Sequence, residues 1–147
     1  MPQKIVIASD HAGFSLKKSL VGHLKRQGYE VLDLGPSTDE NAVDYPLKAK
    51  EIAKEIKKDS AAKGIAICGT GLGMSIAVNR YPFIRGALAY KQNAVRLARQ
   101  HNNANVLCLG GRITSTKTAK VLVDTFLDTK FEGGRHERRV KELGELK

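Results

Sequence analysis

A cysteine stands between an apolar run and a glycine-rich turn. Residues 64–68 are Gly-Ile-Ala-Ile-Cys, and the chain continues as Gly69-Thr70-Gly71-Leu72-Gly73. We expect the run to be a strand that delivers the Cys68 thiol to the edge of a sheet, and the turn to open a helix. Backbone N–H groups at such a turn favour negative charge. A helix N-terminus also stabilises a thiolate, so the pattern indicates catalysis rather than packing.

The glycine turn does not have the pattern of a nucleotide site. A dinucleotide fingerprint needs Gly or Ala in the sixth position, where this chain has Met74, and it needs an acidic residue about 20 residues later. The chain has no such acid there, and the Gly-Lys-Ser/Thr of a phosphate-binding loop is missing. The turn therefore suits a smaller anion or an oxyanion.

Charge is distributed unevenly along the 147 residues. The net charge is +10, and no Asp or Glu occurs between Asp59 and Asp124. Such a balance raises the possibility of a nucleic-acid partner, but aromatic residues are only 5% of the chain and no recognised binding module is present. A phosphorylated small molecule accounts for the basic middle of the chain without nucleic acid.

Polar residues elsewhere could complete a site around the thiol. Asp10 could cap the helix that begins near Gly13, but a cap leaves His11 unexplained. His101 is expected in a loop between a helix and a strand, where ligands often bind. The second cysteine, Cys108, lies within an apolar run and is expected in the core.

Two arginines near the C-terminus are four residues apart. Arg135 and Arg139 would share one face of a helix, and two guanidinium groups on one face suit a phosphate. The alternative is that they pair with Glu132 or Glu142 on the same helix. The sequence leaves both interpretations open.

Apolar runs alternate with helical patterns along the whole chain. Strands are predicted at residues 5–8, 30–34, 64–68, 85–89 and 105–109, and helices at 14–27, 46–58, 73–80, 92–100 and 116–127. This alternation predicts a single domain over residues 1–147, a three-layer α/β/α sandwich with a five-stranded parallel Rossmann-like sheet. Its binding site should lie outside the carboxyl ends of the strands. The C-terminal segment, residues 131–147, has the pattern of a charged helix with few apolar residues to bury by itself. A partner subunit could therefore pack against it.

The number of cysteines and the sequence of the N-terminus indicate in which cellular compartment the protein is expected. Two cysteines make no disulfide framework, which favours a reducing environment. The first apolar run is too short for a signal peptide, and no segment is long enough to cross a membrane. We expect a cytoplasmic protein.

Together these motifs resemble the type B ribose-5-phosphate isomerases, in the wider family that includes galactose- and allose-6-phosphate isomerases. The resemblance covers essentially the whole chain. Its landmarks are Ser9-Asp10-His11-Ala12-Gly13, Asp44-Tyr45-Pro46, the cysteine turn through Ser75, Arg99-Gln100-His101-Asn102, Gly110-Gly111-Arg112 and the segment from Gly133 to Val140. One departure is Asn103, where the family often has aspartate, and it bears on how His101 is oriented.

The resemblance implies an aldose–ketose isomerase that converts D-ribose 5-phosphate and D-ribulose 5-phosphate through a cis-enediolate. Cys68 would be the base, with Thr70 close to it, and His101 the acid/base group that opens the sugar ring. The resemblance implies no metal or other cofactor, and a homodimer or dimer of dimers with active sites at the interface. The substrate would be bound by Asp10, His11, Gly69, Gly71, Leu72, Gly73, Asn102, Arg112, Arg135 and Arg139.

Three other functions remain open from sequence. The same machinery could act on a 6-phosphohexose such as allose or galactose 6-phosphate, because one extra carbon is discriminated by pocket depth. A basic nucleic-acid-binding protein and a non-catalytic phosphosugar sensor are alternatives of another class. The presence of Cys68, His101 and both arginines speaks against a sensor, and no membrane or nucleic-acid partner is expected.

Overall fold

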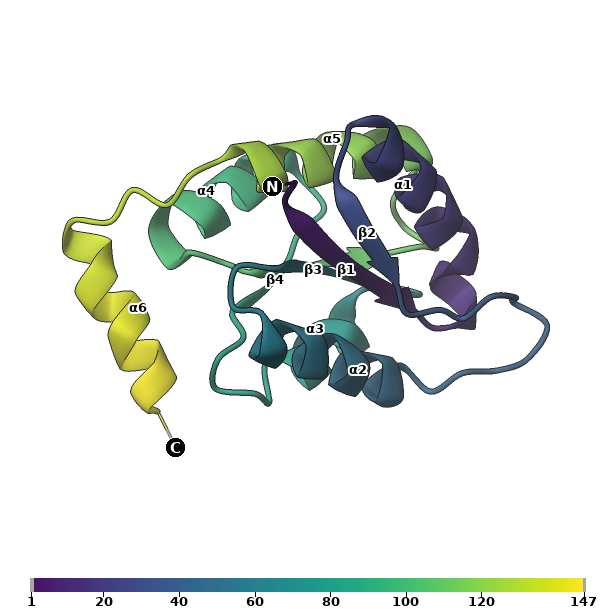
Figure 1. Ribbon diagram of the computed structural model, residues 1–147, viewed down its shortest axis with the longest axis horizontal. Coiled ribbons are helices and arrows are strands. Elements are labelled where there is room, and N and C mark those ends of the chain that lie inside the picture. The colour runs from purple at the N-terminus through teal and green to yellow at the C-terminus, as the bar shows by residue number, and fades with distance from the viewer. Residues whose placement is uncertain (1, 147) are drawn as a thin grey trace.

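Five parallel strands form the centre of the computed structural model, which describes residues 2–146 (Figure 1). Neighbouring strands pair in the order β2-β1-β3-β5-β4, and every pair is parallel. The predicted α/β class and parallel sheet are confirmed. The strands are β1 (Lys4–Ser9), β2 (Glu30–Asp33), β3 (Lys63–Cys68), β4 (Gly86–Leu88) and β5 (Val106–Gly110).

Helices cover both faces of this sheet. A short 3₁₀ turn, η1 (His11–Gly13), leads into α1 (Phe14–Arg26), which covers one face with α4 (Gln92–Asn102) and α5 (Thr116–Asp128). The other face is covered by α2 (Tyr45–Lys58) and α3 (Leu72–Val78). None of these helices, nor any other within residues 2–146, combines the length and apolar character needed to span a bilayer.

Side chains of the central strand divide between the two halves of the core. Ile65 and Ile67 of β3 pack on the side of α1, α4 and α5, whereas Ala66 and Cys68 pack on the side of α2 and α3. Successive residues of a strand point to opposite faces, so a strand buried on both sides reads as a continuous apolar run. The same alternation carries the Cys68 thiol toward the start of α3.

The last helix, α6 (Arg135–Glu145), stands apart from the layered body (Figure 1). Its only buried residue is His136, and Val140 is half-buried. Leu143 and Leu146, at its far end, are 45% and 71% exposed. The predicted charged C-terminal helix is confirmed, and its packing on a partner subunit stays a prediction.

Candidate active site

The carboxyl ends of β1 and β3 meet where the strand order reverses. The Asp10 N–H donates to the carbonyl of Ile67 at 3.1 Å, which joins the residue after β1 to the end of β3. The Gly111 N–H donates to the carbonyl of Cys68 at 2.8 Å, and the Arg112 N–H donates to that of Gly69 at 2.9 Å. In open α/β sheets, ligands bind at the edge where the strand order reverses, and these bonds bring Asp10, Cys68 and Arg112 together there.

Cys68 ends β3 with its side chain held by the turn that follows. The residue is 5% exposed, and its Sγ accepts the backbone N–H of Gly71 at 3.2 Å. A backbone N–H aimed at sulfur stabilises the thiolate, the form that reacts. Cys108 differs, because it is completely buried and burial raises the pKa of its thiol. Its predicted place in the core is confirmed.

The turn requires glycine at position 71. Gly71 has φ of 85°, a left-handed conformation that side chains disfavour. A Cβ there would lie 2.6 Å from Leu88 Cδ1 and 3.0 Å from the carbonyl carbon of Leu109. Gly73 is close to a different element, since a Cβ on it would lie 2.8 Å from the ring of Tyr45. The glycine turn is therefore packed against Leu88 and Leu109 at Gly71 and against Tyr45 at Gly73.

Thr70 is fixed within the turn by two hydrogen bonds. Its Oγ1 accepts the Leu72 N–H at 3.1 Å, and its carbonyl accepts the Tyr90 hydroxyl at 2.7 Å. Sequence reasoning did not assign Tyr45 or Tyr90 to the site. Tyr45 lies in the landmark Asp44-Tyr45-Pro46, whereas nothing in the pattern around Tyr90 distinguishes it from a surface tyrosine.

Asp10 and His11 follow β1 and have different roles. Asp10 is buried, and its Oδ1 accepts the Gly13 N–H at 3.0 Å, so the predicted cap is confirmed. His11 Nδ1 accepts the Val43 N–H at 3.2 Å. A neutral imidazole with an acceptor at Nδ1 carries its proton on Nε2, so His11 can offer one N–H donor to a ligand.

Four of the predicted site residues lie toward the opposite edge of the sheet from Cys68. His101 and Asn102 end α4, a few residues before β5 begins at Val106, whereas Cys68 pairs with Gly110 at the far end of that strand. Four residue steps of about 3.3 Å make β5 about 13 Å long, so one chain holds His101 far from its own Cys68. Arg112 lies beside Gly69 of the cysteine turn, while Arg135 and Arg139 lie on the side of His101 and His136. The separation is compatible with the expected active site at a subunit interface, which stays a prediction.

His101 lies in the last turn of α4, not in the predicted loop. The helix continues to Asn102 and is ended by Asn103, which adopts the left-handed conformation with φ of 48°. Asn tolerates this conformation better than most residues. The amide of Asn103 also accepts a hydrogen bond from Arg99 Nη1 at 2.9 Å, which anchors the end of the helix that carries His101.

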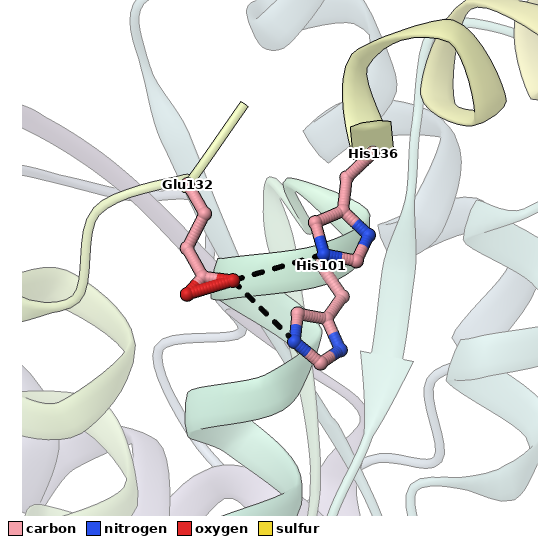
Figure 2. Close-up of side chains that lie close together, drawn as sticks. All are labelled: His101, Glu132 and His136. Atoms are coloured by element: carbon pink, nitrogen blue, oxygen red, sulfur yellow. Dashed lines mark ion pairs between the residues drawn. The ribbon is translucent and has the colours of Figure 1, made fainter. Parts of the chain in front are cut away.

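Glu132 and His136 surround His101 (Figure 2). The two imidazole rings stack, with centroids 4.3 Å apart, and Glu132 Oε1 lies 3.5 Å from His101 Nε2. Burial lowers the pKa of His136, and the neighbouring His101 and Arg135 lower it further. Sequence reasoning did not assign Glu132 to a histidine, because Glu132 lies in the segment before α6 and about thirty residues from His101.

The two arginines of α6 do not form the carboxylate pairs that were the alternative to phosphate binding. Glu132 faces the two histidines, and Glu142 pairs with Arg138 at 3.4 Å. Arg139 lines a hollow of about 490 Å³ together with His101 and Asn102. Arg135 Nε contacts His136 Nε2 at 3.5 Å. Arg139 therefore borders an open space beside His101.

Comparison with known proteins decides the family. The family model described as Ribose/Galactose Isomerase matches residues 5–143. The chain belongs to the ribose/galactose isomerase family. The probable ribose-5-phosphate isomerase B of Mycoplasma genitalium is 44% identical, covering 97% of this chain and 95% of the relative. Ribose-5-phosphate isomerase B of Escherichia coli is 41% identical, covering 96% of this chain and 94% of that protein.

Solved structures of ribose/galactose isomerases share this fold. A ribose 5-phosphate isomerase from Thermotoga maritima superposes with a TM-score of 0.94 at 51% identity, covering 98% of this chain and 99% of that one. Ribose-5-phosphate isomerase B from Mycoplasma genitalium, solved with bound ribulose-5-phosphate, gives 0.93 at 45% identity and covers 99% and 96%. The resemblance seen in the sequence is confirmed.

Proposed function

We propose that this chain is an aldose–ketose isomerase that interconverts D-ribose 5-phosphate and D-ribulose 5-phosphate. The observation that carries the proposal is the Cys68 thiol, held by the Gly71 N–H at the carboxyl edge of the sheet. Family membership and near-complete coverage of relatives named for this activity support it. The match favours this function over a nucleic-acid-binding protein or a sensor.

The proposed reaction moves one proton between neighbouring carbons. Cys68 as thiolate removes the proton from C2 of the open-chain aldose, and the electrons shift onto O1 to give a cis-enediolate. The hydroxyl proton then passes from O2 to O1, and the Cys68 thiol returns the carbon-bound proton to C1, which yields the ketose and restores the thiolate. Backbone N–H groups of the 69–73 turn stabilise the developing oxyanion, and losing one such donor typically costs about 10²–10³ in rate. Thr70 stands close to this base, with its Oγ1 already bonded to Leu72.

The edge around Cys68 supplies polar groups for the sugar. We assign His11 as a donor through Nε2, because Val43 occupies its Nδ1. Asp10 shapes the first loop through its bond to Gly13, and Arg112 lies beside Gly69. Fixing the substrate with such groups converts binding energy into correct placement of the reacting carbon.

The second half of the site comes from a partner subunit in this proposal. One half of the proposed site, which we call the Cys68 half, lies at the carboxyl edge of the sheet. The other, the His101 half, lies at the opposite edge and consists of His101, Asn102, Arg135 and Arg139, so each chain carries two incomplete halves. In a two-fold dimer, the His101 half of one chain can meet the Cys68 half of the other. Exposed apolar side chains beside the cradle support a protein interface there: Leu72 is 52% exposed and Ile76 is 66% exposed.

In the assembled site, His101 opens the furanose ring of the aldose and the arginines hold the phosphate. Ring opening needs an acid/base group that moves a proton at the ring oxygen, and imidazole titrates in the physiological range. Arg135 and Arg139 present guanidinium groups, which match the geometry of phosphate oxygens. We infer a homodimer or a dimer of such dimers.

A direct isomerase assay tests the proposal. Turnover of ribose 5-phosphate should exceed that of allose 6-phosphate and galactose 6-phosphate. Cys68→Ala should lower turnover at least about 10²-fold while the variant still binds a phosphorylated sugar acid in calorimetry. Cys108→Ala is the matched control, since it removes the other thiol, and it should keep turnover. Normal turnover in Cys68→Ala would exclude Cys68 as the base.

A second assay tests the role of His101. His101→Asn should impair conversion of ribose 5-phosphate, which is mostly cyclic, more than conversion of ribulose 5-phosphate, which has no ring to open. Equal losses in both directions would contradict ring opening as its task.

A reducing compartment fits this chemistry, and we propose the cytoplasm. Both cysteines are free thiols, and Cys68 must remain so to act as a base. Blocking free thiols in intact cells and in lysate, followed by mass spectrometry, would measure whether Cys68 is reduced in place.

A further inference from the structure

Three potential metal ligands converge where α4 meets the start of α6 (Figure 2). The ligating atoms of His101, Glu132 and His136 all lie within 4.8 Å of one another. Glu132 Oε1 is 3.5 Å from His101 Nε2 and 3.7 Å from His136 Nε2. The three ligating groups thus lie close enough together to bind one ion after local adjustment of the side chains.

These distances approach those of a tetrahedral zinc site. Ligands at about 2.0–2.1 Å from Zn²⁺ are separated from each other by about 3.3 Å along the edge of a tetrahedron. The separations of 3.5 and 3.7 Å from Glu132 need shifts of only a few tenths of an ångström, whereas the two imidazole nitrogens, within 4.8 Å of each other, must approach by up to about 1.5 Å. Two imidazoles and one carboxylate are also a donor set that zinc uses when a fourth position stays open. We propose that His101, Glu132 and His136 bind a transition-metal ion such as Zn²⁺, and that the bound ion inhibits the enzyme.

Backbone hydrogen bonds fix the positions of the segments that carry the three side chains. The Glu132 N–H donates to the carbonyl of Gln100 at 3.0 Å, which ties the segment before α6 to the last turn of α4. The His136 N–H donates to the carbonyl of Gly133 at 3.1 Å. The two rings stack at 14°, so their in-plane lone pairs are nearly parallel, and one imidazole must turn for both Nε2 atoms to bind the same ion. The backbone segments are already held in place, so only side chains need to adjust.

The surrounding charge sets the strength of this site. Arg135 Nε contacts His136 Nε2 at 3.5 Å, and the ion must displace it. Arg139 lines the same hollow as His101 and His136. Two guanidinium groups oppose a dication, while the single carboxylate of Glu132 favours it. The ion is therefore a reversible inhibitor and not a resident cofactor.

Inhibition follows from the atom that the ion occupies. A metal on His101 Nε2 takes the lone pair that would accept a proton, so His101 can no longer open the ring. This part rests on the proposed function of His101, whereas binding of the ion does not. Loss of ring opening should affect the cyclic aldose more than the ketose.

Binding is tested on the full chain in phosphate-free buffer, by calorimetry with Zn²⁺ and by the visible absorption of Co²⁺. We expect one ion per chain and the intense bands of tetrahedral Co²⁺. Glu132→Gln, at an exposed position, and His136→Gln should each weaken binding at least about 10-fold, since even partners that only orient a ligand are worth 10–100-fold. His23→Gln is the matched control, because His23 pairs with Asp124 at 2.8 Å without a second histidine, and it should bind like wild type.

Cys68→Ala distinguishes this site from the catalytic thiol, and it should retain binding. Loss of binding in Cys68→Ala, unchanged binding in both Glu132→Gln and His136→Gln, or no saturable binding would each overturn the metal site. Zn²⁺ should inhibit turnover of ribose 5-phosphate more than that of ribulose 5-phosphate. Saturable binding at these residues without inhibition would uphold the metal site but overturn the inhibition and the role of His101.

Discussion

Subunit mixing gives the sharpest test of an active site shared between chains. The two variants are Cys68→Ala, which removes the base, and His101→Asn, which removes the ring-opening group at the opposite edge. Because β5 separates these groups by about 13 Å, neither chain can supply both to one site. A mixed dimer then has one site that lacks both groups and one site that is intact.

The recovered activity follows from symmetry. Random exchange of two variants in equal amounts makes about half of the dimers mixed, and each mixed dimer has one of its two sites intact. The mixture should therefore show about a quarter of wild-type activity, although each variant alone is severely impaired. The assay is turnover of ribose 5-phosphate after partial unfolding and refolding of the mixture.

A double variant carrying Cys68→Ala and His101→Asn on one chain is the matched control. Mixed in equal amounts with wild type, it leaves no intact site in a mixed dimer, so activity should fall to about a quarter of the value for wild type alone. Sites built within one chain would instead give about half. No recovery between the single variants, together with half activity in the control, would refute the shared site.

Three further predictions follow from local contacts. Asn103→Asp should stabilise the fold by about 1 kcal/mol, because the 2.9 Å hydrogen bond from the buried Arg99 becomes charge-assisted. Tm at pH 7 should therefore rise by about 2–4 °C, and this gain should vanish below about pH 4, where the new carboxylate is protonated. Gly71→Ala should cost about 2 kcal/mol or more in urea unfolding and lower turnover, because φ is 85° and a Cβ lies 2.6 Å from Leu88. Burial lowers the pKa of His136, so the unfolded chain binds more protons than the folded chain. Stability should therefore fall as pH drops through about 6.5, and the urea midpoint of His136→Gln should depend less on pH than that of the wild type.

Much of the fold is predictable because the strands are buried on both faces. Residues 64–68 read as a continuous apolar run, and the structure places them in β3 with one additional residue, Lys63. Helix ends were less accurate: the third predicted helix reached Arg80, but α3 ends at Val78, where Asn79 bonds to the carbonyls of Ser75 and Gly86 instead. Side-chain bonds of this kind compete with the helix, and hydrophobic periodicity does not report them.

The site was predicted less completely, because spacing along a chain does not say which edge of a sheet a residue occupies. Cys68 and Asp10 follow strands, so the rule for parallel sheets placed them correctly. His101 was expected in a loop, but α4 continues to Asn102 and ends only at the left-handed cap of Asn103, so the histidine stays on the helix at the amino edge of the sheet. Its contact with Glu132 depends on a segment about thirty residues away, which no local pattern reveals.

The separation of the two halves gives a physical reason for the exposed position of α6. If α6 binds phosphate as proposed, packing it fully against its own body would bury the face that carries Arg135 and Arg139. The chain instead attaches α6 near its start, through His136 and the bond from Glu132 to Gln100, and leaves its far end open. Leu143 and Leu146 stay exposed there beside a hollow of about 820 Å³. In the proposed dimer, association would cover these apolar groups and bring the arginines to the Cys68 turn of a second chain, so we expect association and completion of the active site to occur together.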